Sequence, residues 1–151
     1  MLIFLDEPTT GLDSFTATSV METLKDLSKT GRTIIQTIHQ PNSDIYELMD
    51  RLMLLAKGEV IFFNEAHLAV DYFSSINFKC PELSNPSDYF MSIMSIETIQ
   101  AEEGKTAVEL YAERIAYFST NYQRSSLKTD ASSANKNVLP ISEKEQEMMS
   151  R

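Results

Sequence analysis

The chain has 151 residues and a formal net charge of −9, with 22 acidic and 13 basic side chains. This acidic balance argues against nucleic acid as a partner, because its phosphate backbone attracts basic surfaces. Cys80 is the single cysteine, which excludes a disulfide framework and a cysteine-based metal site. No stretch reaches about 18 consecutive apolar residues, so no transmembrane helix is predicted.

A strand–helix–strand unit is predicted at the start of the chain. Residues 2–5 are an apolar run, which suits a strand buried on both faces of a parallel sheet. Asp13 or Ser14 can cap a helix that ends before Gly31. The β-branched segment 33–38 is predicted to be the next strand. Because such units are right-handed with parallel strands, the two strands should run in the same direction.

The rest of the chain is predicted to hold a β-hairpin and several helices. Two apolar strands, 51–56 and 60–63, flank a short turn that contains Gly58. A short helix capped by Asp44 is predicted to precede this hairpin. Further helices are predicted at residues 66–76, from Pro86 onward with Asn85 as cap, and at 106–123.

Three side chains with useful chemistry follow the two predicted parallel strands. Asp6 and Glu7 come directly after the first strand, and His39 follows the second. Because parallel strands end at the same edge of a sheet, we expect these side chains to lie close together. One carboxylate can hold Mg²⁺ while the next orients or deprotonates an attacking water, and a histidine can donate to a phosphate oxygen. A core strand with acids capping the next helix, and a surface-loop histidine, are the alternatives.

The segment LIFLDEPTTGLD, residues 2–13, resembles the Walker B and D-loop segment of ATP-binding cassette (ABC) ATPases. The resemblance implies that Asp6 belongs to the Mg²⁺ site and that Glu7 polarises the hydrolytic water. It also implies that His39 is the switch histidine, which contacts the γ-phosphate of ATP. The cofactors implied are therefore ATP and Mg²⁺.

Two further motifs resemble the G subfamily of ABC transporters, the white–brown type of half-transporter. These are His39-Gln40-Pro41 and the stretch NPSDYF that begins at Asn85. The second departs from the usual Asn-Pro-Ala-Asp-Phe at Ser87 and Tyr89. In the family this motif and the D-loop help to hold two nucleotide-binding domains together. The candidate dimer-interface residues are therefore Gly11, Leu12, Asp13, Asn85, Pro86 and Asp88.

The resemblance implies an α/β fold, a partial P-loop NTPase sheet of the ABC ATPase type with an antiparallel hairpin and helices. Residues 1–96 would form the carboxyl-terminal part of the nucleotide-binding domain. Residues 97–124 would be a linker with an amphipathic helix, and the serine-rich residues 125–151 a disordered tail. The implied partners are a second nucleotide-binding domain, identical or different, and the transmembrane domain of the same transporter, which this chain would lack. The implied location is the cytoplasmic face of a membrane.

The parts of an ABC ATPase that cradle phosphate are missing from the sequence. None of its four glycines belongs to a Walker A loop, and no Leu-Ser-Gly-Gly signature occurs. Gly104-Lys105-Thr106 matches the end of a P-loop, but Ile99 stands where the first glycine should be, so a helix start or a linker is predicted. We therefore expect weak or no ATP binding by the chain alone. Missing strands should also leave an unpaired sheet edge and an exposed apolar face.

In the complete protein, the resemblance implies that two such domains clamp ATP and drive export of a lipid-like or hydrophobic compound. Two alternatives stay open. One is a soluble ABC ATPase that acts on DNA or ribosomes, since such proteins share the Walker B and D-loop segments. The other is a non-enzymatic, truncated fragment that only binds a partner ABC domain.

Overall fold

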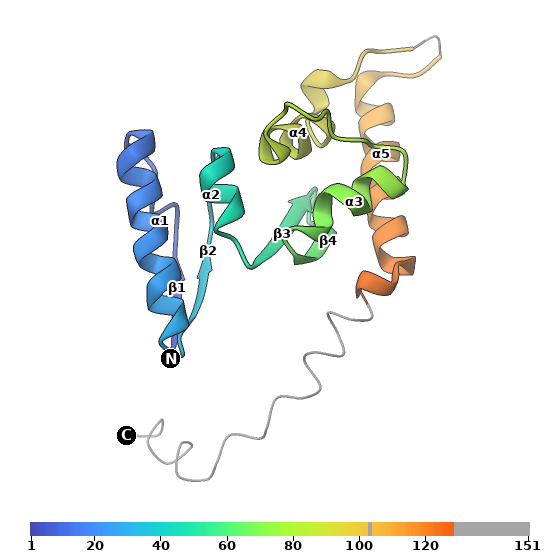
Figure 1. Cartoon of the computed structure of the whole chain (residues 1–151). Coiled ribbons are helices and arrows are strands. Elements are labelled where there is room, and N and C mark those ends of the chain that lie inside the picture. Colours follow the sequence, from blue (N-terminus) through green and yellow to red (C-terminus); the bar gives the residue numbers. More distant parts are fainter. Residues whose placement is uncertain (103, 129–151) are drawn as a thin grey trace, which may run out of the picture.

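The computed structural model describes residues 1–102 and 104–128, which form a mixed arrangement of helices and short strands (Figure 1). Two small sheets are present in this part of the chain, β1 with β2 and β3 with β4. In chain order the elements are β1 (Leu2–Leu5), α1 (Ser14–Lys29), β2 (Thr33–Gln36), α2 (Ser43–Glu47), β3 (Arg51–Ala56), β4 (Glu59–Glu65), α3 (Leu68–Ser75), α4 (Pro86–Ile93), a 3₁₀ turn (Ile96–Thr98) and α5 (Ala107–Arg124).

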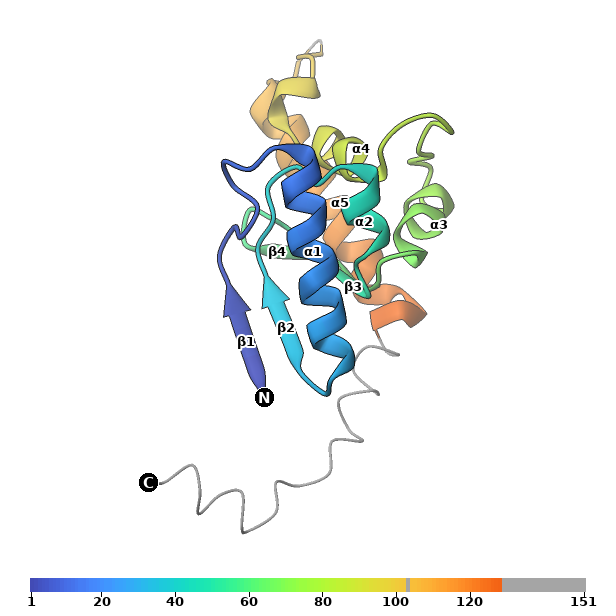
Figure 2. The same cartoon turned by 60° about the vertical axis from the view of Figure 1, so that its left-hand side comes forward.

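The predicted strand–helix–strand unit is confirmed. β1 and β2 pair in parallel, from Leu2 opposite Thr33 to Leu5 opposite Gln36, and Figure 2 shows them side by side with α1 against the sheet. Asp13 caps α1, and the chain turns at Gly31, whose φ is 85°. The cap supplies acceptors for amide groups that otherwise lack a partner at the start of a helix.

The expectation that the first strand is buried on both faces is wrong. One face of the β1–β2 sheet packs toward α1, whereas the other carries large apolar side chains that remain exposed. Leu2 is 51% exposed, Phe4 69% and Ile35 51%. No described element covers these side chains, so burial on the second face is lost. The expected exposed apolar face is therefore observed.

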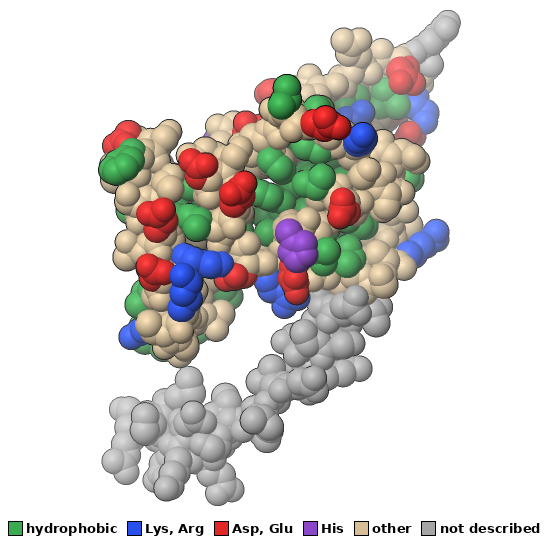
Figure 3. Space-filling view, in the orientation of Figure 1, with side chains coloured by type: hydrophobic (Ala, Val, Ile, Leu, Met, Phe, Trp, Pro, Cys, Tyr) green, Lys and Arg blue, Asp and Glu red, His purple; other side chains and the backbone are tan. Residues whose placement is uncertain are grey.

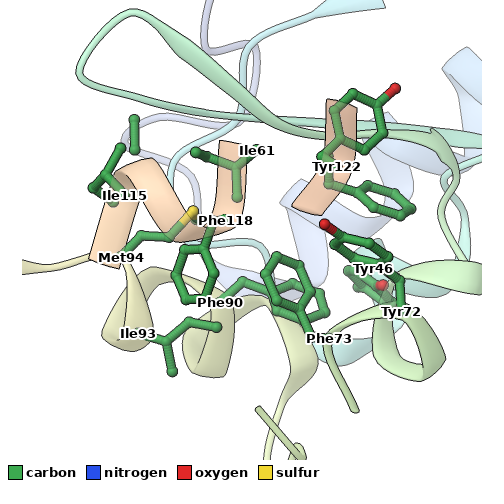
Figure 4. Packing of buried hydrophobic residues seen from close by; sticks show 13 residues of the cluster. Tyr46, Ile61, Tyr72, Phe73, Phe90, Ile93, Met94, Ile115, Phe118 and Tyr122 are labelled. Atoms are coloured by element: carbon green, nitrogen blue, oxygen red, sulfur yellow. The ribbon is translucent and has the colours of Figure 1, made fainter. Parts of the chain in front are cut away.

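The main core lies between the β3–β4 hairpin and helices α3, α4 and α5 (Figure 4). β3 and β4 are antiparallel, as predicted, and join at a turn in which Lys57 and Gly58 both have positive φ. Phe73 lies at the centre of an aromatic cluster, with its ring centroid 4.9 Å from that of Phe90 and 5.6 Å from that of Phe118. Such ring pairs add to the stability gained by burial.

Helix α2 joins this main core to a second, smaller one under α1. Ile45 packs with Ala17 and Met21 in the smaller core, whereas Tyr46 belongs to the main core. The Tyr46 hydroxyl donates to the carbonyl oxygen of Ala66 at 2.7 Å. A five-residue helix thus presents successive side chains to two different clusters and holds them together.

The cap of α2 differs from the prediction. Asn42, not Asp44, supplies it, and the Asn42 Oδ1 atom accepts from the amide of Ile45 at 2.8 Å. Asp44 lies in the first turn of the helix. Both residue types are good caps, so only the backbone conformation decides between them.

Helix α5 begins where the sequence carries its partial P-loop pattern. Thr106 and Glu109 form a capping box, and the Lys105 ammonium lies 2.7 Å from a Glu113 carboxylate oxygen. The segment 104–106 is therefore a helix start, as predicted. Beyond the helix, the carbonyl of Leu127 accepts from the Asn64 side chain at 2.9 Å. The rest of the predicted tail, residues 129–151, lies outside the described residues.

Phe118 tests the packing of α5 against the hairpin, because its side chain is fully buried. We expect Phe118→Ala to lower the free energy of unfolding by about 3–5 kcal/mol through lost burial and a cavity. Val108→Ala, on the exposed side of the same helix, should change it by less than about 0.5 kcal/mol. Urea unfolding followed by circular dichroism measures both, and equal effects would contradict this packing.

Two tyrosines should make the fold sensitive to alkali. Burial raises the pKa of Tyr46 and of Tyr72 from 10.0 to about 12. The folded state favours the neutral phenols. Relative to strong alkali, their burial therefore contributes to the free energy of unfolding in full below pH 10, and this contribution is lost as the pH rises toward 12. A stability profile against pH, with tyrosinate absorbance, should show this loss. Tyr72→Phe should make the loss of stability in alkali smaller. It should not lower the free energy of unfolding near neutral pH, because the Tyr72 hydroxyl has no hydrogen-bond partner among the described residues. Tyr46→Phe should cost about 0.5–1.5 kcal/mol for its lost hydrogen bond.

Candidate functional site

A pocket of about 480 Å³ opens between the loops that follow β1 and β2 and the starts of α1 and α2. Glu7 and His39, the proposed water-activating and phosphate-contacting residues, both line it. The sheet thus brings these two side chains to one site, as expected from the parallel strands. The lining residues are Glu7, Thr9, Thr10, Gly11, Leu12, Ser14, Ala17, His39, Gln40, Pro41, Asn42 and Ile45.

Both loops bend through backbone conformations that are unusual for residues other than glycine. Glu7 has φ of 44° and Gln40 has φ of 50°. The Thr10 hydroxyl donates to Glu7 Oε2 at 2.8 Å, and the Thr10 amide donates to the Glu7 carbonyl at 3.1 Å. These bonds hold the turn that continues into Gly11, whose φ is 79°. Such conformations are kept only where the surroundings support them, and they cluster at functional sites.

Thr37 ties the two loops together. Its hydroxyl donates to Asp6 Oδ1 at 2.5 Å and accepts from the amide of Glu7 at 2.9 Å. One side chain at the end of β2 therefore fixes both the first carboxylate and the backbone of the second. Thr37 was not among the predicted site residues, because a threonine after a β-branched strand carries no signal of its own.

The two acidic residues do not share the pocket. Glu7 lines it, whereas Asp6 does not. Asp6, the first residue after β1, is exposed and accepts a hydrogen bond from Thr37. Of the expected acidic pair, Glu7 alone therefore lines this pocket.

A Mg²⁺ ion would find one protein ligand at this edge. Asp6 Oδ1 is engaged by Thr37, and no hydrogen bond of the described residues involves Asp6 Oδ2. Residues 1–102 and 104–128 hold no group of three or more histidine, cysteine or acidic side chains placed to bind a metal ion. Mg²⁺ is often held by one or two carboxylates together with water and substrate phosphates, so Asp6 fits a contributory ligand.

His39 is free to meet a ligand. Its side chain is exposed and makes no hydrogen bond within the described residues. The two residues that follow are held more tightly than the imidazole. Gln40 has a positive φ, and Pro41 is buried. The exposed imidazole can reach a bound anion without a large movement of the backbone.

The candidate interface residues have structural partners inside the chain. Asp13 Oδ1 accepts from the amides of Phe15 and Thr16 at 3.1 and 3.0 Å, and its Oδ2 accepts from the Thr16 hydroxyl at 2.7 Å. The backbone and side-chain hydrogen bonds from Thr16 hold the pKa of Asp13 below its usual value. Beside it, Leu12 is exposed in the pocket rim.

The second candidate interface segment is the start of α4. Asn85 caps the helix, Pro86 is its first residue, and Asp88 is exposed in its first turn. Proline suits this position because its missing amide would lack a helical partner anyway. The Asn85 side chain also donates to the carbonyl of Pro41 at 2.9 Å, which links α4 to the pocket loop. Residues 11–13 and the start of α4 therefore both border the loops of the pocket.

The bridging hydroxyl of Thr37 gives a direct test of the site geometry. We expect Thr37→Val to raise amide hydrogen exchange at Glu7 by about tenfold, since a lost hydrogen bond is worth about 1 kcal/mol or more. Thr37→Ser, which keeps the hydroxyl, should retain protection. Thr33→Val is the matched control, because no side-chain hydrogen bond of Thr33 occurs in the described structure. Unchanged exchange at Glu7 in Thr37→Val would contradict the bridge.

Comparisons with known proteins place the chain among transporters. Residues 39–148 match the membrane-domain family model described as ABC-2 type transporter. Protein white of Drosophila melanogaster is 40% identical over 85% of this chain and 18% of its own length. ABC transporter G family member 11 of Arabidopsis thaliana is 52% identical over 60% of this chain and 13% of its own length. The broad substrate specificity ATP-binding cassette transporter ABCG2 of Bos taurus is 51% identical over 62% of this chain and 14% of its own length.

These matches correct two expectations. The family model is of the membrane-domain type, whereas the resemblance implied the carboxyl-terminal part of a nucleotide-binding domain. The predicted location at the cytoplasmic face of a membrane is wrong for the same reason, since most of the chain matches a membrane-domain model. Within the described ranges, however, no helix combines the length and apolar character needed to cross a bilayer.

The comparisons also set the scale of the match. The chain spans less than a fifth of the length of these curated relatives. The family model nevertheless covers residues 39–148, well over half of the chain, and the relatives are G-subfamily transporters. The chain therefore belongs to the ABC-2 type transporter family and is a G-subfamily ABC transporter sequence.

Proposed function

We propose that residues 1–96 form the carboxyl-terminal part of an ATP-binding cassette and that the pocket faces the terminal phosphate of ATP. The observation that carries the proposal is that Glu7 and His39, from neighbouring parallel strands, line one pocket. Residues 1–38 precede the range matched by the family model, and they include both the Walker B-like strand and the D-loop-like turn. The fold proposed is thus a partial P-loop NTPase sheet.

Glu7 is proposed to orient and deprotonate the attacking water. Its carboxylate is exposed in the pocket and accepts one hydrogen bond, from Thr10, to Oε2. Its Oε1 atom makes no hydrogen bond within the described residues and so remains available to a water. A carboxylate positioned by one neighbour and open at its other oxygen suits a general base.

His39 is proposed to donate a hydrogen bond to the γ-phosphate. Its exposed imidazole, which has no hydrogen-bond partner in residues 1–102 and 104–128, lines the same pocket as Glu7. A hydrogen bond to an ionised oxygen is among the stronger ones, so the presence or loss of that phosphate would change the loop. Bound Mg²⁺ would offset negative charge on the phosphates, with Asp6 as one of its ligands.

The remaining parts of an ATPase must come from elsewhere. A phosphate-binding loop needs glycines that let backbone amides surround the anion. The sequence has Gly11, Gly31, Gly58 and Gly104, and none lies in such a loop. The exposed apolar face with Leu2, Phe4 and Ile35 is proposed to meet further parts of the cassette. The chain alone is therefore proposed to be inactive.

In the complete protein, two cassettes, identical or different, are proposed to close over ATP and to power export of lipid-like or hydrophobic compounds. The candidate contacts between them are Gly11, Leu12, Asp13, Asn85, Pro86 and Asp88. Membership of a transporter family supports this proposal over a soluble ABC ATPase. A non-enzymatic role, in which the chain only binds a partner ABC domain, is the second candidate, since no phosphate-binding loop is present.

The test uses a full-length G-subfamily transporter whose matching segment is replaced by residues 1–96 of this chain. We expect ATP hydrolysis in this chimera, and about a 10²–10⁴-fold loss of turnover in Glu7→Gln with ATP still bound, because general-base catalysis contributes that much. His39→Ala should also lose turnover. Phosphate release and nucleotide binding are the measurements.

His67→Ala is the matched control, since His67 is the other histidine of the chain, is exposed and lies beside Glu65. It should leave turnover unchanged. The isolated 151-residue chain should show no hydrolysis. Single-turnover hydrolysis by that chain, abolished by Glu7→Gln, would overturn the statement that it is inactive alone. Full turnover of Glu7→Gln in the chimera would overturn the proposed role of Glu7.

A further inference from the structure

The side chain of Asn85 makes two hydrogen bonds with different purposes. Its Oδ1 atom accepts from the amide of Ser87 at 3.1 Å, which caps α4. Its Nδ2 atom donates to the carbonyl of Pro41 at 2.9 Å, across 44 residues of sequence. The first bond belongs to the helix itself. The second links the helix to the loop that carries His39.

That loop needs support from outside. Gln40 has φ of 50°, a conformation that L-residues adopt only when their surroundings maintain it. Pro41 has no amide hydrogen, so it cannot donate a bond of its own. Asn42 bonds forward into α2. Among the described residues, Asn85 is the one residue outside this loop and α2 whose side chain hydrogen-bonds to residues 39–42.

We call the hydrogen bond from Asn85 to the Pro41 carbonyl the tether. Its Asn85 end belongs to α4, a helix that is packed into the main core. α4 carries Phe90, which is 1% exposed, and Ile93 into the main core. The Phe90 ring lies 4.9 Å from that of Phe73 and 6.3 Å from that of Tyr46, which also belongs to α2. Figure 4 shows Phe90 and Ile93, both from α4, among the packed residues of this core. The tether therefore ties the loop of residues 39–42 to α4, whose position is set by its packing in the main core.

We propose that Asn85 is a positioning residue for His39, acting through its hydrogen bond to Pro41. The bond fixes where the loop crosses the pocket and couples that position to the main core. Both polar atoms of the Asn85 side chain are engaged inside the chain, which gives this residue an internal role besides any contact with a partner domain. The functional consequence rests on the proposed role of His39, whereas the tether itself does not.

The experiment separates the tether from the helix cap. Asn85→Ser keeps a good capping side chain and adds no charge, but it is too short to reach Pro41. Asn85→Ala removes both functions. The probe is NMR of the 151-residue chain without nucleotide, using the backbone amides of Gln40 and Asn42 and the imidazole signals. The chain has only two histidines, so His67 is an internal control.

In Asn85→Ser we expect the order parameters of Gln40 and Asn42 to fall from about 0.85 toward 0.6 or below. The His39 imidazole signal should shift, while His67 and the amides of α4 stay unchanged. Asn85→Ala should show the same loop changes and lose protection at the start of α4. Unchanged loop order and an unchanged His39 signal in Asn85→Ser would overturn the proposal, and so would equal changes throughout α4.

A second arm uses the chimera described above. Asn85→Ser should lower kcat by about two- to twelvefold, the range expected for one lost hydrogen bond, with KM for ATP unchanged. Unchanged kcat alongside a disturbed loop would overturn the coupling to His39. If even the parent chimera bound no ATP, the proposed function would fail, while the NMR result would still decide the tether.

Discussion

The parallel pairing of β1 with β2 is the constraint on which the site depends. Its register places Leu5 opposite Gln36, so the chain leaves both strands at the same edge of the sheet. Thr37 then closes the edge by bonding to Asp6 and to the backbone of Glu7. A shift by one residue would turn the Thr37 side chain to the other face and separate these groups.

The pocket is built on the smaller core: Ala17 and Ile45 line it, whereas none of its lining residues belongs to the main core. Among the described residues, the smaller core has three buried side chains with a few partly buried ones against them, whereas the main core holds a cluster of packed aromatic rings. α2 connects them through Ile45 and Tyr46, and Asn85 adds a hydrogen bond from α4 to Pro41. Acidic side chains spread over the visible face of α1 and α2 (Figure 3). The loop that carries His39 is therefore linked to the main core both through α2 and through Asn85.

Most elements could be predicted because their signals are local. Apolar spacing indicates α1, and capping chemistry indicates Asp13. Other features depend on the tertiary arrangement. The burial of Phe4 depends on which elements cover the sheet, and the choice of Asn42 as a cap depends on the backbone. The bridge from Thr37 joins positions 31 residues apart, so no local pattern reveals it.

The open side of the β1–β2 sheet also governs how the chain behaves in salt. Molecules with a net charge of −9 repel one another. This repulsion opposes association of two molecules through the exposed apolar face around Phe4. Added electrolyte shortens the range of that repulsion to about 8 Å at physiological ionic strength, while contact between apolar surfaces is not weakened. The resistance of this chain to aggregation therefore depends on charge repulsion between molecules, which opposes the attraction between their exposed apolar faces.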